Sequence, residues 1–381
     1  MIMERKHWID NLRWTTVLFV LLYHVIYFYN NKGVFGGIGG FGHYPEVPQY
    51  QDVLMYVLYP WFMPLLFLLA GISAKYALDK QPAGQWFRSR TRKLLVPSTI
   101  GLFVFQWMTG YFNTQVAAVV QGNNPFAGIP ENVPVFIQRI IMYFAYSLSG
   151  IGPLWFIQVL WLLCLVLLFV RAIDKKDKIW SLCGNANLVL IIMLGVLFWA
   201  GEQTLIKNPR PESADGLYNL YKPLFYLILF LMGYFVFSHD KVQKILGKWW
   251  IPLMVCAVAS GTALVVTTFG QDNTSPQYLG NWLNCLYGWL MCLALMGWFK
   301  AKFDRTGRFA GYMTRSSYGI YIVHYLVIAS LGYMMKMYTS LPPVAMYLIL
   351  AVAVFTLSPL LNEVIKRIPF VRWCVLGEKV G

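Results

Sequence analysis

The chain has 381 residues, of which 58% are hydrophobic and only 12% are charged. Soluble domains carry about 25% charged residues, so the composition excludes an ordinary soluble enzyme or binding domain and predicts an integral membrane protein. The net charge of +15 does not indicate a nucleic-acid partner, because the basic residues follow the loops of a membrane protein. We therefore expect the lipid bilayer, and no nucleic acid, as a partner.

Ten apolar runs of about 20 residues occur along the chain, and each is long enough to cross a bilayer as a helix. Because lipid supplies no hydrogen-bond partners for the backbone, helices are the expected form. The sequence predicts an all-α integral membrane protein, a bundle of about ten transmembrane helices in one polytopic domain over residues 1–381, without a separate soluble domain. The predicted segments are 12–29, 53–76, 95–112, 154–172, 187–205, 222–238, 251–268, 281–299, 317–336 and 343–362.

The loops between these segments differ sharply in charge. If the N-terminus is cytoplasmic, 23 of the 31 Lys and Arg residues fall on the cytoplasmic side and 6 on the outer side. This excess follows the positive-inside rule, so both termini are predicted to be cytoplasmic. The longest loop, roughly 113–153, contains an amphipathic stretch around 135–146 rather than a second domain.

The six cysteines show no paired spacing, and most lie in or beside predicted helices. Buried cysteines of this kind usually behave as small hydrophobic residues. We expect neither a disulfide framework nor a metal site.

The first predicted helix carries ionisable residues along one face. Asp10 and Arg13 are one turn apart, and His24 follows Arg13 by eleven residues, about three turns. At 1.5 Å per residue, His24 lies roughly 16 Å deeper than Arg13, about halfway through a ~30 Å hydrocarbon core. Ionisable groups at such depth usually carry function, so we expect chemistry or a proton path. The alternative is a His24 that only hydrogen-bonds a neighbouring helix.

A basic cluster precedes the third predicted helix and includes Arg90, Arg92 and Lys93. Guanidinium groups bind phosphate oxygens in a bidentate manner, so this cluster could hold a polyphosphate at the inner face. The alternative is positive-inside anchoring by anionic lipid headgroups.

A second candidate site comprises His324, Tyr321 and Ser317 of the ninth segment and Trp155 at the start of the fourth. His324 lies eight residues past Ser316, about 12 Å into the helix, so a second imidazole reaches mid-depth. A hydrogen-bonded role and a catalytic role are both open for it.

The predicted outer loops 31–52, 113–134 and 269–281 are rich in amide and aromatic side chains or glycine. Amides bind sugar hydroxyls and rings cover apolar sugar faces, which suits a glycan. Ordinary turn-forming sequence is the equal alternative.

Several of these motifs together resemble the membrane acyltransferase-3 family, whose members modify bacterial surface glycans. They occur in the family's order over nearly the whole chain: Asp10-x-x-Arg13, the Arg-x10-His spacing of Arg13 and His24, residues 63–71, the basic cluster before residues 94–97, residues 152–156 and residues 318–324. The resemblance implies an acyl-CoA donor, acetyl-CoA first of all, bound from the cytoplasm, and an acceptor beyond the membrane.

Roles for individual residues follow from this resemblance. Arg90, Arg92 and Lys93 would hold the donor phosphates, Asp10 and Arg13 would orient the donor or stabilise charge, and His24 would act as general base or transient acyl carrier. Two positions depart from the family pattern, because the second basic residue of Arg-x-x-Arg is a lysine and Ala70 replaces the serine of a Ser-Gly pair. No fused extracytoplasmic domain is expected.

The sequence thus predicts a multi-pass O-acyltransferase of the bacterial inner membrane. It would move an acyl group, acetyl or succinyl, from acyl-CoA to a hydroxyl of a glycan or lipid-linked sugar. The alternatives are a secondary transporter or flippase for such a glycan and a non-catalytic assembly protein. A homodimer or a separate partner protein remains open.

Overall fold

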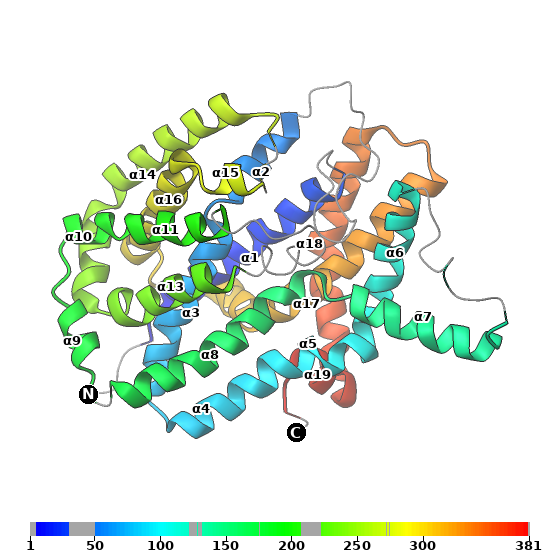
Figure 1. Ribbon diagram of the computed structural model, residues 1–381, viewed down its shortest axis with the longest axis horizontal. Helices are drawn as coiled ribbons and strands as arrows, with labels where there is room; N and C mark the ends of the chain where they lie inside the picture. Colours follow the sequence, from blue (N-terminus) through cyan, green and yellow to red (C-terminus); the bar gives the residue numbers. More distant parts are fainter. Residues whose placement is uncertain are drawn as a thin grey trace. The chain divides into compact units, whose positions relative to one another are not determined.

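The computed structural model describes residues 5–29, 50–121, 128, 132–174, 176–206, 222–271, 273 and 275–379 (Figure 1). All regular secondary structure in this part of the chain is helical, which confirms the predicted all-α class there. The described chain divides into two compact units. Unit 1 comprises 1–20, 53–88 and 162–315, and unit 2 comprises 21–52, 89–161 and 316–381.

Four helices contribute residues to both units, and they are α1 (His7–Phe28), α4 (Ala83–Arg90), α8 (Trp155–Ile173) and α17 (Arg308–Tyr338). Unit 1 also contains α2 (Val53–Leu58), α3 (Phe62–Leu78), α9 (Lys178–Cys183), α10 (Leu188–Met193), α11 (Gly195–Ile206), α13 (Pro223–Met232), the π-helical turn η5 (Gly233–Phe237), α14 (Asp240–Thr268), α15 (Pro276–Leu279) and α16 (Trp282–Lys302). Unit 2 also contains the short 3-10 helices η1 (Tyr50–Asp52) and η4 (Gly152–Leu154), the π-helical turns η2 (Thr91–Leu95) and η3 (Leu102–Gln106), and the helices α5 (Val96–Ser98), α6 (Trp107–Gln121), α7 (Val135–Ser149), α18 (Pro343–Arg367) and α19 (Pro369–Leu376).

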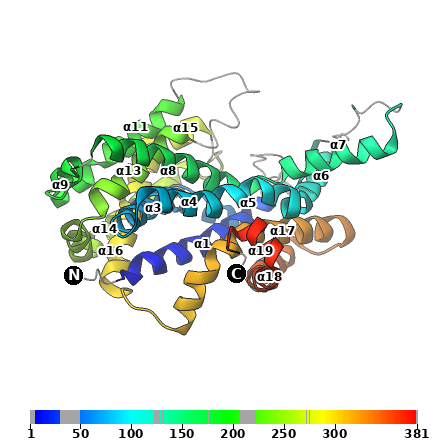
Figure 2. The ribbon, with the colours of Figure 1, turned by 90° about the horizontal axis from the view of Figure 1, so that it is seen from below.

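Within unit 1, the long helices α14 and α16 lie side by side (Figures 1 and 2). Helix α16 is preceded by Asn281, whose side chain accepts a hydrogen bond from the Leu283 backbone N–H at 2.9 Å and so caps the helix. Helix α3 packs closely on α13 and η5, because a Cβ on Gly71 or Gly233 would lie 2.0 or 2.1 Å from a backbone oxygen of the opposite helix. Glycine at these positions permits the close backbone approach typical of membrane helices.

Within unit 2, α6 packs against α7, and the Asn113 side chain donates to the Ser149 carbonyl oxygen at 3.0 Å. Helices α18 and α19 also lie together in both ribbon views (Figure 2). Helix α7 occupies the predicted amphipathic stretch, and many of its apolar side chains are exposed. At 1.5 Å per residue, its 15 residues span about 22 Å, which is shorter than a hydrocarbon core.

All ten predicted segments are helical, but not all are long single spans. Among the described residues, seven helices are long and apolar enough to cross a membrane. The segments 187–205 and 222–238 correspond to shorter apolar helices, and 95–112 is divided among η2, α5, η3 and α6. The reason is local, since turns and π-helical segments interrupt the runs that hydropathy alone joins. The count of about ten and the cytoplasmic termini stay predictions.

Candidate active site

Helices α1 and α17 bring two histidines together in unit 2. His24 Nδ1 lies 3.3 Å from His324 Nε2, and the ring centroids are 5.1 Å apart. The two residues are 300 positions apart in the sequence, and each comes from a predicted membrane-spanning segment. The structure therefore joins the primary and secondary candidate sites of the sequence into one imidazole pair.

The hydrogen bonds of this pair define its tautomers. His324 Nδ1 lies 2.6 Å from the carbonyl oxygen of Tyr321, and a carbonyl only accepts, so Nδ1 carries the proton. In the neutral ring, Nε2 is then an acceptor, and it faces His24 Nδ1. This contact assigns the Nδ1–H tautomer to His24 and leaves the lone pair on its Nε2.

The two imidazoles differ in access. His324 is 0% exposed, whereas His24 is half-buried. Of the two imidazoles, only His24 therefore has exposed surface, and His324 is placed to hydrogen-bond its neighbour. Both roles of His324, the hydrogen-bonded and the catalytic one, stay predictions.

Three tyrosine rings surround His24. The centroids of Tyr23, Tyr325 and Tyr27 lie 5.5, 5.3 and 6.4 Å from the imidazole, all in edge-to-face geometry. The Tyr325 hydroxyl is buried and has no hydrogen-bond partner among the described residues. An unsatisfied buried hydroxyl costs about 1–3 kcal/mol, so a ligand that supplies an acceptor would be favoured there. Tyr325 was not predicted from the sequence, although it directly follows His324.

The other members of the second candidate site have structural contacts. The Tyr321 hydroxyl donates to the Pro153 carbonyl oxygen, and its ring lies 5.8 Å from that of Phe156. Trp155 is half-buried at the first position of α8, and Ser317 is buried in α17. Tyr321 thus joins α17 to η4, while its own carbonyl oxygen orients His324.

A buried amide also positions this part of α17. Gln106, the last residue of η3, is 3% exposed, and its Nε2 donates to the Ile322 carbonyl oxygen at 3.1 Å. Its Oε1 accepts from the Thr109 hydroxyl at 2.9 Å. π-Helical turns often occur at functional sites. In the sequence, Gln106 is marked only as a single glutamine within an apolar run.

The predicted phosphate-binding residues Arg90, Arg92 and Lys93, here called the cation cluster, lie where α4 passes into η2. The Val96 N–H donates to the Thr91 carbonyl oxygen, the five-residue spacing of a π-helix. Pro97 has no N–H for the carbonyl of Lys93 four residues earlier.

A neighbouring helix compensates for that missing donor. The Tyr318 hydroxyl donates to the Lys93 carbonyl oxygen, and the Arg92 Nε donates to the Gly377 carbonyl oxygen at 3.1 Å. Gly377 has φ +59°, and a Cβ there would lie 2.2 Å from the Arg92 carbonyl oxygen. The turn that carries the cations is therefore held by contacts from α17 and from the segment after α19.

The cation cluster has an excess of positive charge. Partial burial lowers the pKa of Lys93, and the neighbouring charges of Arg90 and Arg92 lower it further, against the opposing effect of Glu378. Mutual repulsion of this kind favours a bound anion. The phosphate contact of the cluster stays a prediction.

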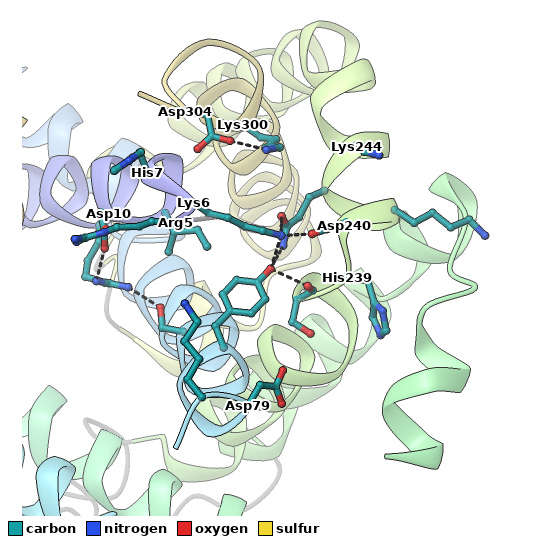
Figure 3. A pocket seen from close by; sticks show the side chains of 18 of the residues that line it. Arg5, Lys6, His7, Asp10, Asp79, His239, Asp240, Lys244, Lys300 and Asp304 are labelled. Carbon is teal, nitrogen blue, oxygen red and sulfur yellow. Dashed lines mark hydrogen bonds and ion pairs between the residues drawn. The ribbon is translucent and has the colours of Figure 1, made fainter. Parts of the chain in front are cut away.

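The remaining predicted residues, Asp10 and Arg13, lie together in unit 1. Arg13 Nη1 is 3.2 Å from Asp10 Oδ1, and Arg5 Nη2 is 2.8 Å from Asp10 Oδ2 (Figure 3). Arg13 Nη2 also donates to Ser73 Oγ at 2.6 Å. Ala70 replaces the serine of the family pattern, and Ser73, one turn later in α3, accepts the hydrogen bond from Arg13.

Other expected sites receive less support. Residues 31–49, 122–127, 129–131, 272 and 274 of the outer loops lie outside the described residues. Asn113, one of the amides considered for sugar binding, is 3% exposed. Its side-chain amide donates to the Ser149 carbonyl oxygen at the end of α7. Among the described residues, no three His, Cys, Asp or Glu side chains are grouped so that they could hold a metal ion.

Comparison with known proteins identifies one family. A search of curated proteins and a search of solved structures found no match. The family model of acyltransferase-3, described as an acyltransferase domain, matches residues 6–363. The match includes α1, the cation cluster, the histidine pair and most of the apolar helices. The chain therefore belongs to the acyltransferase-3 family of membrane acyltransferases.

Proposed function

We propose that the chain is an O-acyltransferase of the bacterial inner membrane that uses cytoplasmic acyl-CoA. The acceptor would be a hydroxyl of an extracytoplasmic glycan or lipid-linked sugar, and acetyl is the expected acyl group, with succinyl as the alternative. Family membership supports the reaction class. The observation that carries the proposal is the contact between His24 and His324, 3.3 Å apart.

In this proposal His24 is the general base. Its Nε2 takes the proton of the acceptor hydroxyl while the hydroxyl oxygen attacks the carbonyl carbon of the thioester. The carbon–sulfur bond then breaks, and the imidazolium returns the proton to the departing thiolate, so that an ester and free CoA thiol result. A neutral imidazole suits this task because its ordinary pKa is close to neutral pH. Transient acylation of the same nitrogen is the alternative path.

His324 acts through His24 as a positioning residue. Its Nδ1–H bond to the Tyr321 carbonyl oxygen makes its Nε2 an acceptor, which holds the His24 Nδ1–H and directs the His24 lone pair to Nε2. The Tyr325 hydroxyl is proposed to donate to the oxygen that becomes negative when the thioester carbonyl is attacked. Such donors typically contribute about 10²–10³ in kcat.

The donor phosphates are assigned to the cation cluster. Its charge-assisted hydrogen bonds would fix the nucleotide end of acyl-CoA, and the lowered pKa of Lys93 indicates a site that gains from an anion. Asp10 and Arg13 are proposed to orient the donor or to stabilise charge, as the family pattern implies. Their ion pair, with Ser73 bound to Arg13, gives the guanidinium a defined position.

The test uses purified full-length protein with radiolabelled acetyl-CoA and glycans extracted from bacterial envelopes. An acyltransferase consumes the thioester and transfers label to the glycan, and its His24→Gln variant does not. A transporter or flippase would move the glycan between compartments without thioester cleavage. Mass spectrometry of surface glycans from cells that express either form would identify the acyl group and the acceptor.

A further inference from the structure

Unit 1 contains a polar cavity of about 980 Å³ that borders the Asp10–Arg13 pair (Figure 3). Its size is within the range of small-molecule sites. Among the described residues that line it, Ile9 is the only aliphatic one. Because charged and polar side chains make up most of its lining, this cavity is suited to a hydrophilic ligand rather than to an acyl chain.

The cavity carries an excess of positive charge, because seven Lys and Arg side chains line it against four Asp. Each Asp is already engaged in an ion pair within unit 1. The pairs are Asp10 with Arg5 and Arg13, Asp79 with Lys75, Asp240 with Lys6, and Asp304 with Lys300. The carboxylates are thus occupied, and the remaining positive charge is not neutralised by the lining.

Three lysines account for that remaining charge. Lys80, Lys241 and Lys244 are exposed, and in the described part of the chain no carboxylate lies within 4.0 Å of their amino groups. Lys80 follows α3, and the other two lie near the start of α14. No side chain caps this helix start, and uncapped backbone N–H groups there add to the attraction for anions.

A network of hydrogen bonds makes this wall of the cavity rigid. Lys6 Nζ donates to the Tyr76 hydroxyl at 2.8 Å and to Gln243 Oε1 at 3.0 Å, and Gln243 Nε2 donates to the same hydroxyl at 2.7 Å. The Tyr76 hydroxyl donates to the Ser238 carbonyl oxygen at 2.8 Å. Burial lowers the pKa of Lys6, but its hydrogen bonds to Asp240 and Tyr76 outweigh this and raise the pKa overall. Lys6 therefore contributes a permanent positive charge.

We propose that this cavity is a phosphate-binding site separate from the cation cluster. The ligand is an anion that carries phosphate groups, and the free lysines at the start of α14 and after α3 contact it directly. All seven cations lie at or near the predicted cytoplasmic ends of helices. The ligand would therefore be a soluble cytoplasmic phosphate compound or the headgroup of an inner-leaflet lipid. The proposal stands without the proposed acyl transfer, because binding is measured directly.

The first test measures pyrophosphate binding by calorimetry, with the full chain in nanodiscs of phosphatidylcholine. The variant Lys80→Gln/Lys241→Gln/Lys244→Gln should bind at least about tenfold more weakly, since several charge-assisted hydrogen bonds are lost. The matched control, Lys176→Gln/Lys248→Gln/Lys302→Gln, removes the same charge from exposed lysines of unit 1 that do not line the cavity and should bind normally.

The second test distinguishes the sources of phosphate. Native mass spectrometry of protein from phosphatidylglycerol nanodiscs should show retained lipid, lost in the cavity variant but not in the control, if the ligand is a headgroup. Pyrophosphate binding in phosphatidylcholine nanodiscs identifies a soluble ligand. A variant with glutamine throughout the cation cluster should retain the binding that depends on Lys80, Lys241 and Lys244, because the cluster and the cavity lining share no residue. The proposal is wrong if neither ligand binds, or if the cavity variant and its control lose binding equally.

Discussion

Replacement of His24 by glutamine tests the proposed base most directly. Glutamine retains hydrogen-bonding groups but cannot take a proton, so a purely structural histidine should tolerate it. Loss of a general base typically costs about 10²–10⁴ in rate, equivalent to about 2.7–5.4 kcal/mol at 1.36 kcal/mol per tenfold. We expect His24→Gln to fold, insert and bind acyl-CoA normally while transferring almost nothing.

The structure predicts a smaller effect for His324. A neutral hydrogen bond contributes about 0.5–1.5 kcal/mol, and the 3.3 Å separation from His24 is long for such a bond. His324→Gln should therefore slow transfer by roughly two- to tenfold. Because His324 is 0% exposed and acts only through its neighbour, its substitution should have almost no further effect when His24 is already glutamine.

The assay is initial-rate transfer of labelled acetyl from acetyl-CoA, measured from pH 5 to 8 for both single variants and the double variant. Thermal unfolding and acyl-CoA binding serve as controls for folding and insertion. A His24→Gln variant with more than about a tenth of the normal rate would falsify the assignment of the base. If His324→Gln costs as much as His24→Gln, or if the two effects add in the double variant, His324 does not act through His24.

Four further outcomes are expected. Glutamine throughout the cation cluster should raise the KM for acyl-CoA by at least about tenfold and leave kcat nearly unchanged. An unchanged KM would show that the cluster only anchors the protein to lipid headgroups. Because the pKa of Lys93 is lowered, this side chain loses its charge at lower pH than an ordinary lysine. The affinity for acyl-CoA should therefore fall as pH rises, and Lys93→Arg should abolish that fall. Tyr325→Phe should lower kcat by about 10²–10³ without a change in KM, and a normal kcat would exclude its hydroxyl as a donor. Cysteines at Gly84 and Gly307, where a Cβ meets no neighbouring atom, should resist an impermeant thiol reagent in intact cells, while one at Gly128 should react. The opposite labelling would reverse the predicted orientation.

Much of the helical architecture could be predicted from local pattern. Each of the ten apolar runs is helical, because hydropathy and the demands of lipid on the backbone act within a single segment. The count of long spans was harder to predict. Pro97 and the π-helical turns of the third segment divide a run that hydropathy alone treats as continuous, and such interruptions depend on which neighbouring groups can bond the freed carbonyls.

The candidate site could be predicted only in part. Asp10 and Arg13 were placed together correctly, since they are one turn apart on one helix. Ser73 and Gln106 were missed, because a polar residue within an apolar run does not reveal which helix it faces. Tyr325 was missed for the same reason, although its ring lies 5.3 Å from that of His24.

The sequence by itself determined the class of protein, the segments that become helices, the uneven charge of the loops and the family. These properties depend on composition, on spacing along one helix and on an ordered set of motifs. Only the tertiary structure decided that His24 meets His324 across 300 residues, that Tyr318 bonds the carbonyl left without a donor by Pro97, and that lysines from separate segments share one cavity in unit 1. Contacts between distant segments depend on how helices pack, and helix packing is not encoded in the periodicity of any single helix.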